Sequence, residues 1–240
     1  MLVVRAVNEH RFLTTPQIQA LFFYKGTEAG AARTCRRTLA WLTREHVLVR
    51  LERRVGGVRA GSASFVYSIG PVGRRLLPDA RRTTEPSILF LDHTLAIGDV
   101  RVLLEEAQRR GELELVTVEI EPASWRHFIG SGGARDIVRP DLYIVTATDE
   151  YEDAWFLEID RGTESPAAIA RKCRAYDRYW RNGREQATHG SFPVTVWVAP
   201  DERRGSRIER IIGAARGLNR DLFRVTSGPQ LLTLLRGGLA

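Results

Sequence analysis

The chain has 240 residues, of which 43% are hydrophobic and 27% charged, and its formal net charge is +7. This composition is typical of a globular protein with one large or two small domains, and it excludes a disordered or fibrous protein. No apolar run approaches the ~18 residues of a membrane span. The N-terminus lacks the basic region followed by an apolar region that is typical of a signal peptide, so we expect a cytoplasmic protein with no membrane partner. Cys35 and Cys173 lie far apart without Cys or His companions, which argues against a disulfide framework or a zinc finger.

The positive charge is confined to one part of the chain. Residues 1–85 carry 15 basic and 6 acidic side chains, a net charge of +9, whereas residues 86–240 carry 21 basic and 23 acidic side chains, a net charge of −2. The change coincides with a polar stretch bounded by Pro78 and Pro86, which is typical of a linker. The sequence therefore predicts two domains, at residues 1–78 and 91–240, joined by a linker at residues 79–90.

The N-terminal part predicts helices followed by a β-hairpin. A helix over Gln17–Phe23 follows a threonine N-cap and a proline, and a longer helix over Ala29–Arg44 follows a glycine-containing turn. Two strands, Val47–Arg53 and Phe65–Ile69, flank a glycine-rich tip, and a short helix over Val72–Leu77 comes next. This order of elements is that of a winged helix-turn-helix.

Arginines lie opposite the apolar stripe of the longer helix, at about 100° per residue, and beside the two strands. We therefore expect this helix to enter the major groove of double-stranded DNA and the strand arginines to lie along phosphates. The alternative is a winged helix that contacts protein, with its arginines as a solvated face. The candidate DNA-binding residues are Arg33, Arg36, Arg37, Arg44, Arg53, Arg54 and Arg59.

The C-terminal part alternates helices and strands. The predicted helices are Asp99–Arg110, Pro166–Arg181 and Ser206–Arg216, and the predicted strands are Leu113–Ile120, Asp141–Ala147, Asp153–Asp160, Phe192–Ala199 and Leu222–Val225. Such alternation predicts an α/β domain with a mixed sheet flanked by helices. Together with the N-terminal domain, the whole chain is α+β.

Three carboxylates are expected at one end of a β-hairpin. If its turn lies near Glu150, the numbers of paired residues sum to about 300, which places Asp141 opposite Glu158 to Asp160. Two carboxylates ~5 Å apart repel by about 3 kcal/mol at an effective dielectric of ~20, so a metal, a shared proton or nearby cations must neutralise them. Hard oxygen ligands suit Mg²⁺ or Mn²⁺, which predicts a metal site at Asp141, Glu158 and Asp160. A salt-bridge cluster with Arg139, Arg161 or Lys172 is the alternative.

The helix that follows this hairpin carries one of the two lysines of the chain. Lys172 lies on the flank of the helix, ~60° from its buried stripe, where a long side chain can reach the sheet edge. Lysine offers a compact charge and a tunable pKa, so Lys172 is a candidate catalytic residue beside the three acids. The alternative is an ordinary boundary lysine whose charged end stays in water.

Pro140-Asp141, the run from Glu158 to Glu164 (EIDRGTE), Lys172 and Tyr176 resemble the replication-relaxation family of bacterial plasmids and integrated conjugative elements. The resemblance implies an N-terminal winged helix and a C-terminal domain similar to PD-(D/E)xK nucleases. Asp141 would match the first metal-binding aspartate and Glu158 the second acid, whereas Asp160 stands where an active nuclease of that fold has lysine. The site would be restored if Lys172 supplied the charge from the helix, or if Asp160 were a third metal ligand.

Three functions are compatible with these features. The first is a DNA-binding protein of a mobile genetic element that acts in plasmid replication, relaxation or transfer and carries a nuclease-like domain. The second is an endonuclease that uses Mg²⁺ or Mn²⁺ to cut phosphodiester bonds, and the third is a winged-helix transcriptional regulator with a non-catalytic interaction domain. The expected partner is double-stranded DNA, with a second copy of the chain and replication or conjugation proteins as further candidates.

Overall fold

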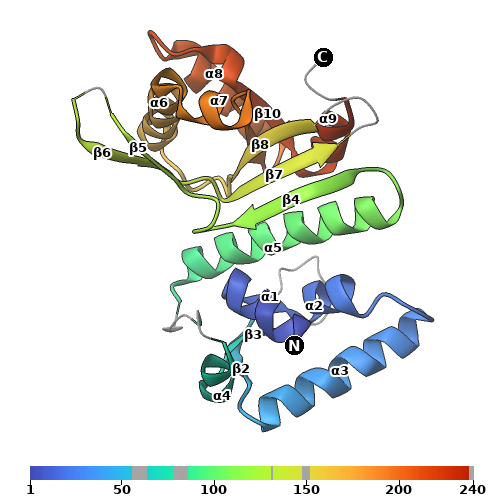
Figure 1. The fold of residues 1–240 in the computed structure, drawn as a ribbon. Coiled ribbons are helices and arrows are strands. Elements are labelled where there is room, and N and C mark those ends of the chain that lie inside the picture. The colour runs from blue at the N-terminus through green and yellow to red at the C-terminus, as the bar shows by residue number, and fades with distance from the viewer. Residues whose placement is uncertain (56–63, 78–79, 81–85, 131, 148–151, 238–240) are drawn as a thin grey trace. The chain divides into compact units, whose positions relative to one another are not determined.

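The computed structural model describes residues 1–55, 64–77, 80, 86–130, 132–147 and 152–237, without the side chains of residues 52–55 (Figure 1). Contacts within the chain divide it into two units, Met1–Glu106 and Ala107–Ala240. Each unit is mixed in secondary structure and has its own hydrophobic core. In the described part of the chain, no helix has the length and apolar character needed to cross a membrane.

The first unit contains helices and a three-stranded antiparallel sheet of order β1-β3-β2. Its elements are α1 (Leu2–His10), β1 (Leu13–Thr14), α2 (Thr15–Phe22), α3 (Glu28–Arg44), β2 (Leu48–Val55), β3 (Ser64–Ile69), α4 (Pro71–Leu76) and most of α5 (Ile88–Arg109). The helices and strands expected between residues 17 and 77 are thereby confirmed, whereas α1 was not predicted. Arg59 lies outside the described residues, as do the side chains of Arg53 and Arg54.

The buried stripe of α3 forms as its spacing predicts. Ala31, Cys35, Leu39 and Leu42 are buried along one side of the helix, and Thr27 caps its N-terminus by accepting a hydrogen bond from the backbone N–H of Gly30. The stripe packs into a core with residues of α1, α2 and the sheet. Burial of one side of α3 leaves the opposite side, which carries the arginines, in solvent.

The helix α5 is longer than expected and groups with the first unit as far as Glu106. Two kinds of contact tie α5 to this unit: Leu91 and Leu95 pack with Phe12 and Val66, and the Gln17 side-chain amide donates to the Leu95 carbonyl at 2.7 Å and to Asp99 Oδ1 at 2.6 Å. We expected the second domain to begin near residue 91. Contacts place the division after Glu106 instead, since α2 holds the first part of α5.

The second unit is built on a five-stranded mixed sheet of order β10-β9-β8-β7-β4. The strands β8, β9 and β10 are parallel, and β7 is antiparallel to both β4 and β8. Its elements are β4 (Glu114–Ile120), β5 (Arg126–Ile129), β6 (Arg135–Val138), β7 (Leu142–Ala147), β8 (Glu152–Ile159), α6 (Pro166–Asn182), α7 (Arg184–His189), β9 (Val194–Ala199), α8 (Glu202–Ala214), β10 (Phe223–Ser227) and α9 (Leu231–Gly237). The mixed sheet is confirmed; the ribbon of β5 and β6 and the helices α7 and α9 were not predicted.

The helices α6 and α8 are the crossovers between the parallel strands, and both lie on the same side of the sheet (Figure 1). Tyr176 of α6 and Ile208 of α8 join a core that includes Phe156 and Trp197 of the sheet. Each helix begins just after the carboxyl end of the preceding strand, so the N-termini of α6 and α8 lie at the same edge of the sheet. The predicted acids lie at this edge.

Candidate functional site

The hairpin of β7 and β8 brings Asp141 to the end of β8. Leu142 pairs with Leu157, which confirms the expected register. The backbone N–H of Asp141 donates to the Leu157 carbonyl at 3.0 Å, and the N–H of Ile159 donates to Asp141 Oδ2 at 2.7 Å. Asp141 therefore lies across from the segment that carries Glu158 and Asp160, as the sequence predicts.

Glu158 is 1% exposed, and both of its carboxylate oxygens accept hydrogen bonds from α6. The Lys172 ammonium lies 2.8 Å from Oε2, and the Tyr176 hydroxyl donates to Oε1 at 2.6 Å. Lys172 also binds Glu164 Oε1 at 2.6 Å. Lys172 and Tyr176 are one helical turn apart, so a single side of α6 holds the buried carboxylate from two directions.

Burial and neighbouring charges shift the ionisation of this cluster. Burial raises the pKa of Glu158 to about 7, the ammonium of Lys172 opposes this rise, and the charge of Asp141 adds to it. Burial by itself lowers the pKa of Lys172, but the carboxylates of Glu158, Asp141 and Glu164 outweigh it and the pKa is raised. Burial and Glu158 raise the pKa of Tyr176 well above its ordinary value. At neutral pH the cluster therefore offers a charged lysine, a phenol donor and a carboxyl group able to exchange a proton.

Asp160 has a different partner from Glu158. Its fully buried carboxylate binds Arg204 of α8 through two hydrogen bonds, Nε to Oδ2 at 2.7 Å and Nη2 to Oδ1 at 2.9 Å. The backbone N–H of Gly162 donates to Oδ2 at 2.9 Å. Arg204 Nη2 also donates to the Glu164 carbonyl at 2.8 Å, so this arginine fixes the turn that presents Glu164 to Lys172.

These contacts determine which acids fit a metal ion. A site for Mg²⁺ commonly uses one or two carboxylates, with water and phosphate oxygens as the remaining ligands, and Asp141 and Glu158 fit such a site by type and proximity. Both oxygens of Asp160 bind the buried guanidinium of Arg204, so Asp160 does not fit. Both oxygens of Glu158 are also hydrogen-bonded, but the ammonium on Oε2 belongs to the partly exposed Lys172 and would have to leave before a metal ion could bind there. Over the described residues, no group of three or more His, Cys, Asp or Glu side chains is placed to hold a metal ion. Both pairs follow the salt-bridge alternative: Lys172, one of the cations named for it, pairs with Glu158, whereas Asp160 pairs with Arg204 instead of Arg139 or Arg161.

The arginines predicted on the longer N-terminal helix lie on the solvent side of α3. Those described there as exposed are Arg33, Arg36, Arg37 and Arg44. Trp41 is 51% exposed on the same helix. A groove of about 1030 Å³ lies between α2, α3 and β3, and its lining includes Arg36, Arg44 and Arg50 together with Phe65. The guanidinium of Arg50 lies 4.2 Å from the Phe65 ring centroid, an arrangement typical of a cation–π contact.

Arg204 was missed from the sequence because the predicted helix started at Ser206. The helix starts at Glu202, since Asp201 caps it by accepting a hydrogen bond from the backbone N–H of Arg204 at 2.8 Å. The signal was an aspartate, Asp201, separated from the end of a buried strand by Pro200 alone and three residues before Arg204. A helix start at that aspartate would have placed Arg204 on the same side as Ile208, toward the sheet.

Comparison with known proteins relates the chain to one protein family. A family model described as replication-relaxation matches residues 4–195, a segment that contains α3, the β7–β8 hairpin and α6. No curated protein and no solved structure matches the chain.

Proposed function

The chain belongs to the replication-relaxation family, which associates it with replication and relaxation, and from this premise we propose that it is a DNA-binding protein of a mobile genetic element. In this proposal the first unit binds double-stranded DNA as a winged helix. The element order α1-β1-α2-α3-β2-β3 and the sheet order β1-β3-β2 support it. A winged helix places its second helix-turn-helix element, here α3, in the major groove and the β2–β3 ribbon along the backbone.

The observation that carries the proposal is the segregation of charge on α3. The helix buries its apolar stripe and exposes four arginines on the other side, over a length of about 16 Å from Arg33 to Arg44. Its first turn holds Glu28, which complements the helix dipole and lies away from these arginines. Arginine pairs with phosphate oxygens and with guanine edges through two parallel hydrogen bonds, so this side of α3 suits a DNA groove.

The test is the salt dependence of duplex binding by the full chain. Arg33→Gln/Arg37→Gln removes two exposed charges from α3, and we expect weaker binding and a log–log salt slope smaller by roughly 2. The matched control is Arg135→Gln/Arg224→Gln, which removes two exposed arginines from the second unit. Equal affinity and equal slope for the α3 variant and the control would exclude α3 as the DNA-binding surface.

A second candidate function, metal-dependent cleavage of phosphodiester bonds, is favoured by the cluster around Glu158. Asp141 and Glu158 would hold Mg²⁺ or Mn²⁺, which supplies an activated water when bound. The side chain of Lys172 is 35% exposed, so its ammonium can meet a phosphate and stabilise the negative charge that develops there. Tyr176 orients the Glu158 carboxylate from the buried side.

Two measurements test this second function. Supercoiled plasmid in Mg²⁺ or Mn²⁺ should be nicked by the wild-type chain, more slowly by Lys172→Met, and not by Asp141→Asn, while the exposed Asp136→Asn retains activity. Calorimetric titration with Mn²⁺ reports binding independently of cleavage and should lose its signal in Asp141→Asn. If no metal supports nicking while duplex binding is intact, the second unit is an interaction domain, as in a transcriptional regulator.

A further inference from the structure

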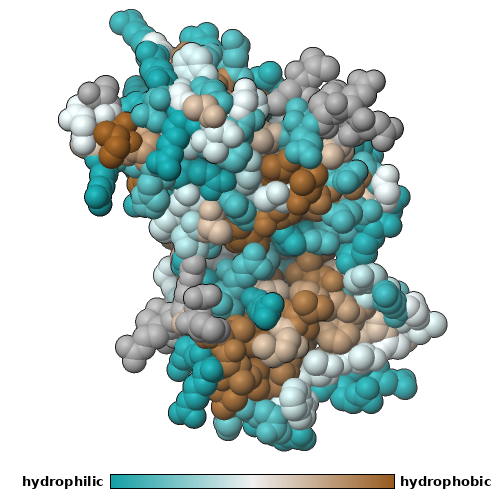
Figure 2. Space-filling view, viewed as in Figure 1, coloured by the Kyte–Doolittle hydropathy of each residue, from teal (hydrophilic) through white to brown (hydrophobic). Residues whose placement is uncertain are grey.

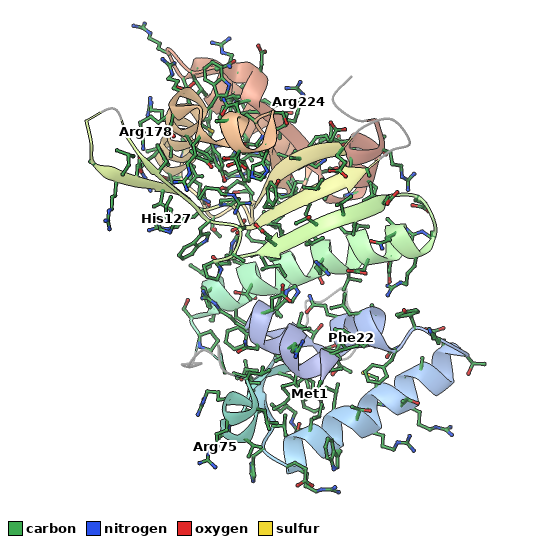
Figure 3. The ribbon with its side chains drawn as sticks, in the orientation of Figure 1. Met1, Phe22, Arg75, His127, Arg178 and Arg224 are labelled. Carbon is green, nitrogen blue, oxygen red and sulfur yellow. The ribbon has the colours of Figure 1, made fainter. Side chains whose placement is uncertain are left out.

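The outer side of α6 carries a row of arginines. Their spacing of three, four and three residues aligns them on one side of the helix over about 15 Å, opposite the buried Ile169, Cys173 and Tyr176. All four are exposed, and Figure 3 labels one of them, Arg178, beside α6. The row consists of Arg171, Arg174, Arg178 and Arg181.

A second row lies on α8. Arg203, Arg207 and Arg210 are exposed and spaced four and three residues apart, opposite the buried Ile208. At about 100° per residue, the exposed Glu209 lies roughly 100° or more from each of these arginines. The outer surface of α8, at the top of Figure 2, is largely hydrophilic. Glu202, the other acid of α8, lies in its first turn, about 100° from Arg203 and about 140° from Arg207, so neither acid faces the arginine row.

The two rows border one surface, because α6 and α8 are parallel neighbours on the same side of the sheet. Beyond the end of α8, the Gly217 carbonyl accepts from Arg181 at 2.9 Å and the Asn219 N–H donates to Asp177 at 3.1 Å. These contacts place α8 on the flank of α6 that carries Arg174 and Arg181. On α6 the arginines are turned from the outward direction toward the flank that contacts α8. On α8, which runs parallel to α6, the arginines are turned from the outward direction in the opposite sense of rotation, and that flank is the one toward α6.

Most of this charge has no counter-ion in the described part of the chain. Arg178 pairs with Asp136 at 2.7 Å and Arg181 with Asp177 at 2.8 Å, and both arginines remain about half exposed. The other five arginines of the two rows form no ion pair with any described residue. Like charges gathered on one surface repel one another, and a polyanion relieves this repulsion.

We propose that the outer side of α6 and α8, the α6–α8 arginine surface, is a second DNA-binding surface that contacts the phosphate backbone of a duplex. Duplex DNA carries one negative charge per ~1.7 Å of its axis when both strands are counted, so a ~15 Å length of duplex contains roughly nine phosphates, of which those on the near side can meet the row. Each guanidinium can bind a phosphate through two parallel hydrogen bonds. The net charge of −2 over residues 86–240 conceals this surface, because acids on other elements of the unit, such as the exposed Glu114 of β4 and Glu152 of β8, offset its charge in the sum.

The test measures binding of the full chain to a 30-base-pair duplex of random sequence over a range of salt concentrations. Arg174→Gln/Arg207→Gln removes one exposed charge from each helix, and we expect at least about tenfold weaker binding and a log–log slope smaller by roughly 2. The control Arg135→Gln/Arg224→Gln removes two exposed arginines from other elements and should bind as the wild type does. Circular dichroism confirms that both variants fold.

The outcome is separate from that of the α3 variant. Wild-type affinity of Arg174→Gln/Arg207→Gln overturns the second surface whether or not α3 binds DNA. If Arg174→Gln/Arg207→Gln binds duplex more weakly and Arg33→Gln/Arg37→Gln binds as the wild type does, the second surface is supported and α3 is excluded as a DNA-binding surface. If polyglutamate competes as well as DNA of equal charge, the partner is an acidic protein surface and the proposal fails. Absence of any duplex binding by the wild type overturns both surfaces.

Discussion

Replacing Asp160 by alanine separates an ion-pair role for this residue from a metal-ligand role. The change leaves the Arg204 guanidinium, 9% exposed, without the carboxylate that binds it through two hydrogen bonds of 2.7 and 2.9 Å. Removing one partner of a buried pair costs about 3–5 kcal/mol, because the remaining charge stays desolvated. We therefore expect Asp160→Ala to lower the free energy of unfolding of the second unit by that amount.

Tryptophan fluorescence during denaturant unfolding can report the second unit alone. The chain has five tryptophans, and in a Trp41→Phe background those that remain all lie after residue 107. The exposed pair of Asp136 and Arg178 provides the matched control, and Asp136→Ala should cost under about 1 kcal/mol. The double variant Asp160→Ala/Arg204→Met should recover part of the loss, since no buried charge is left unpaired.

The result that would refute this reasoning is an equal, small cost for Asp160→Ala and Asp136→Ala. If Mg²⁺ or Mn²⁺ then stabilised the wild type but not Asp160→Ala, Asp160 would be a metal ligand, and the pair with Arg204 would be only an alternative state of the same carboxylate.

Three further predictions concern stability. Burial, reinforced by the charge of Arg101, lowers the pKa of His10 to about 3, so the unfolded chain binds the proton first. The free energy of unfolding of the first unit should therefore fall by about 1.4 kcal/mol per pH unit as the pH drops below about 6.5. Hydrogen exchange of the α3 amides measures this fall, which should be absent in His10→Gln. A Cβ on Gly73 would lie 2.3 Å from a backbone carbonyl, so Gly73→Ala should destabilise the first unit by about 1–3 kcal/mol. A Cβ on Gly213 of α8 would lie in open space, so Gly213→Ala should stabilise the second unit by about 0.5–1 kcal/mol. Calorimetry measures both changes. Gln17→Leu removes a buried side-chain amide that donates to the Leu95 carbonyl and to Asp99 and accepts from the Thr14 N–H. It should cost about 1–3 kcal/mol, more than Gln19→Leu, as denaturant unfolding followed by circular dichroism would measure.

The hairpin and Lys172 could be predicted because their signals are local. Alternating side chains and a polar turn fix the register of β7 and β8, and a one-residue slip would move Glu158 to the other side of the sheet. Helical periodicity similarly fixes Lys172 on the flank of α6, from which its side chain reaches Glu158. In both cases the spacing of nearby residues determines the geometry.

The start of α5 could not be predicted because tertiary packing overrides local preference there. The predicted helix began at Asp99, directly after Gly98, a residue that disfavours a helix interior. In the structure a Cβ at Gly98 would lie 2.9 Å from Gln17 Nε2. Glycine at this position lets the Gln17 side chain reach the backbone of α5, a requirement set by a residue far away in sequence.

The pair of Asp160 and Arg204 joins positions 44 residues apart, from the end of β8 to the first turn of α8, with α6, α7 and β9 between them. The entropy of closing a loop delays contacts between positions so distant, so we expect the turn that carries Glu164 to settle late in folding. A chain truncated after Ala199 would keep Asp141, Glu158, Lys172 and the entire segment matched by the family model. It would nevertheless lack the helix that locks this turn, so shortened chains would carry the acids and the lysine without the complete arrangement that positions them.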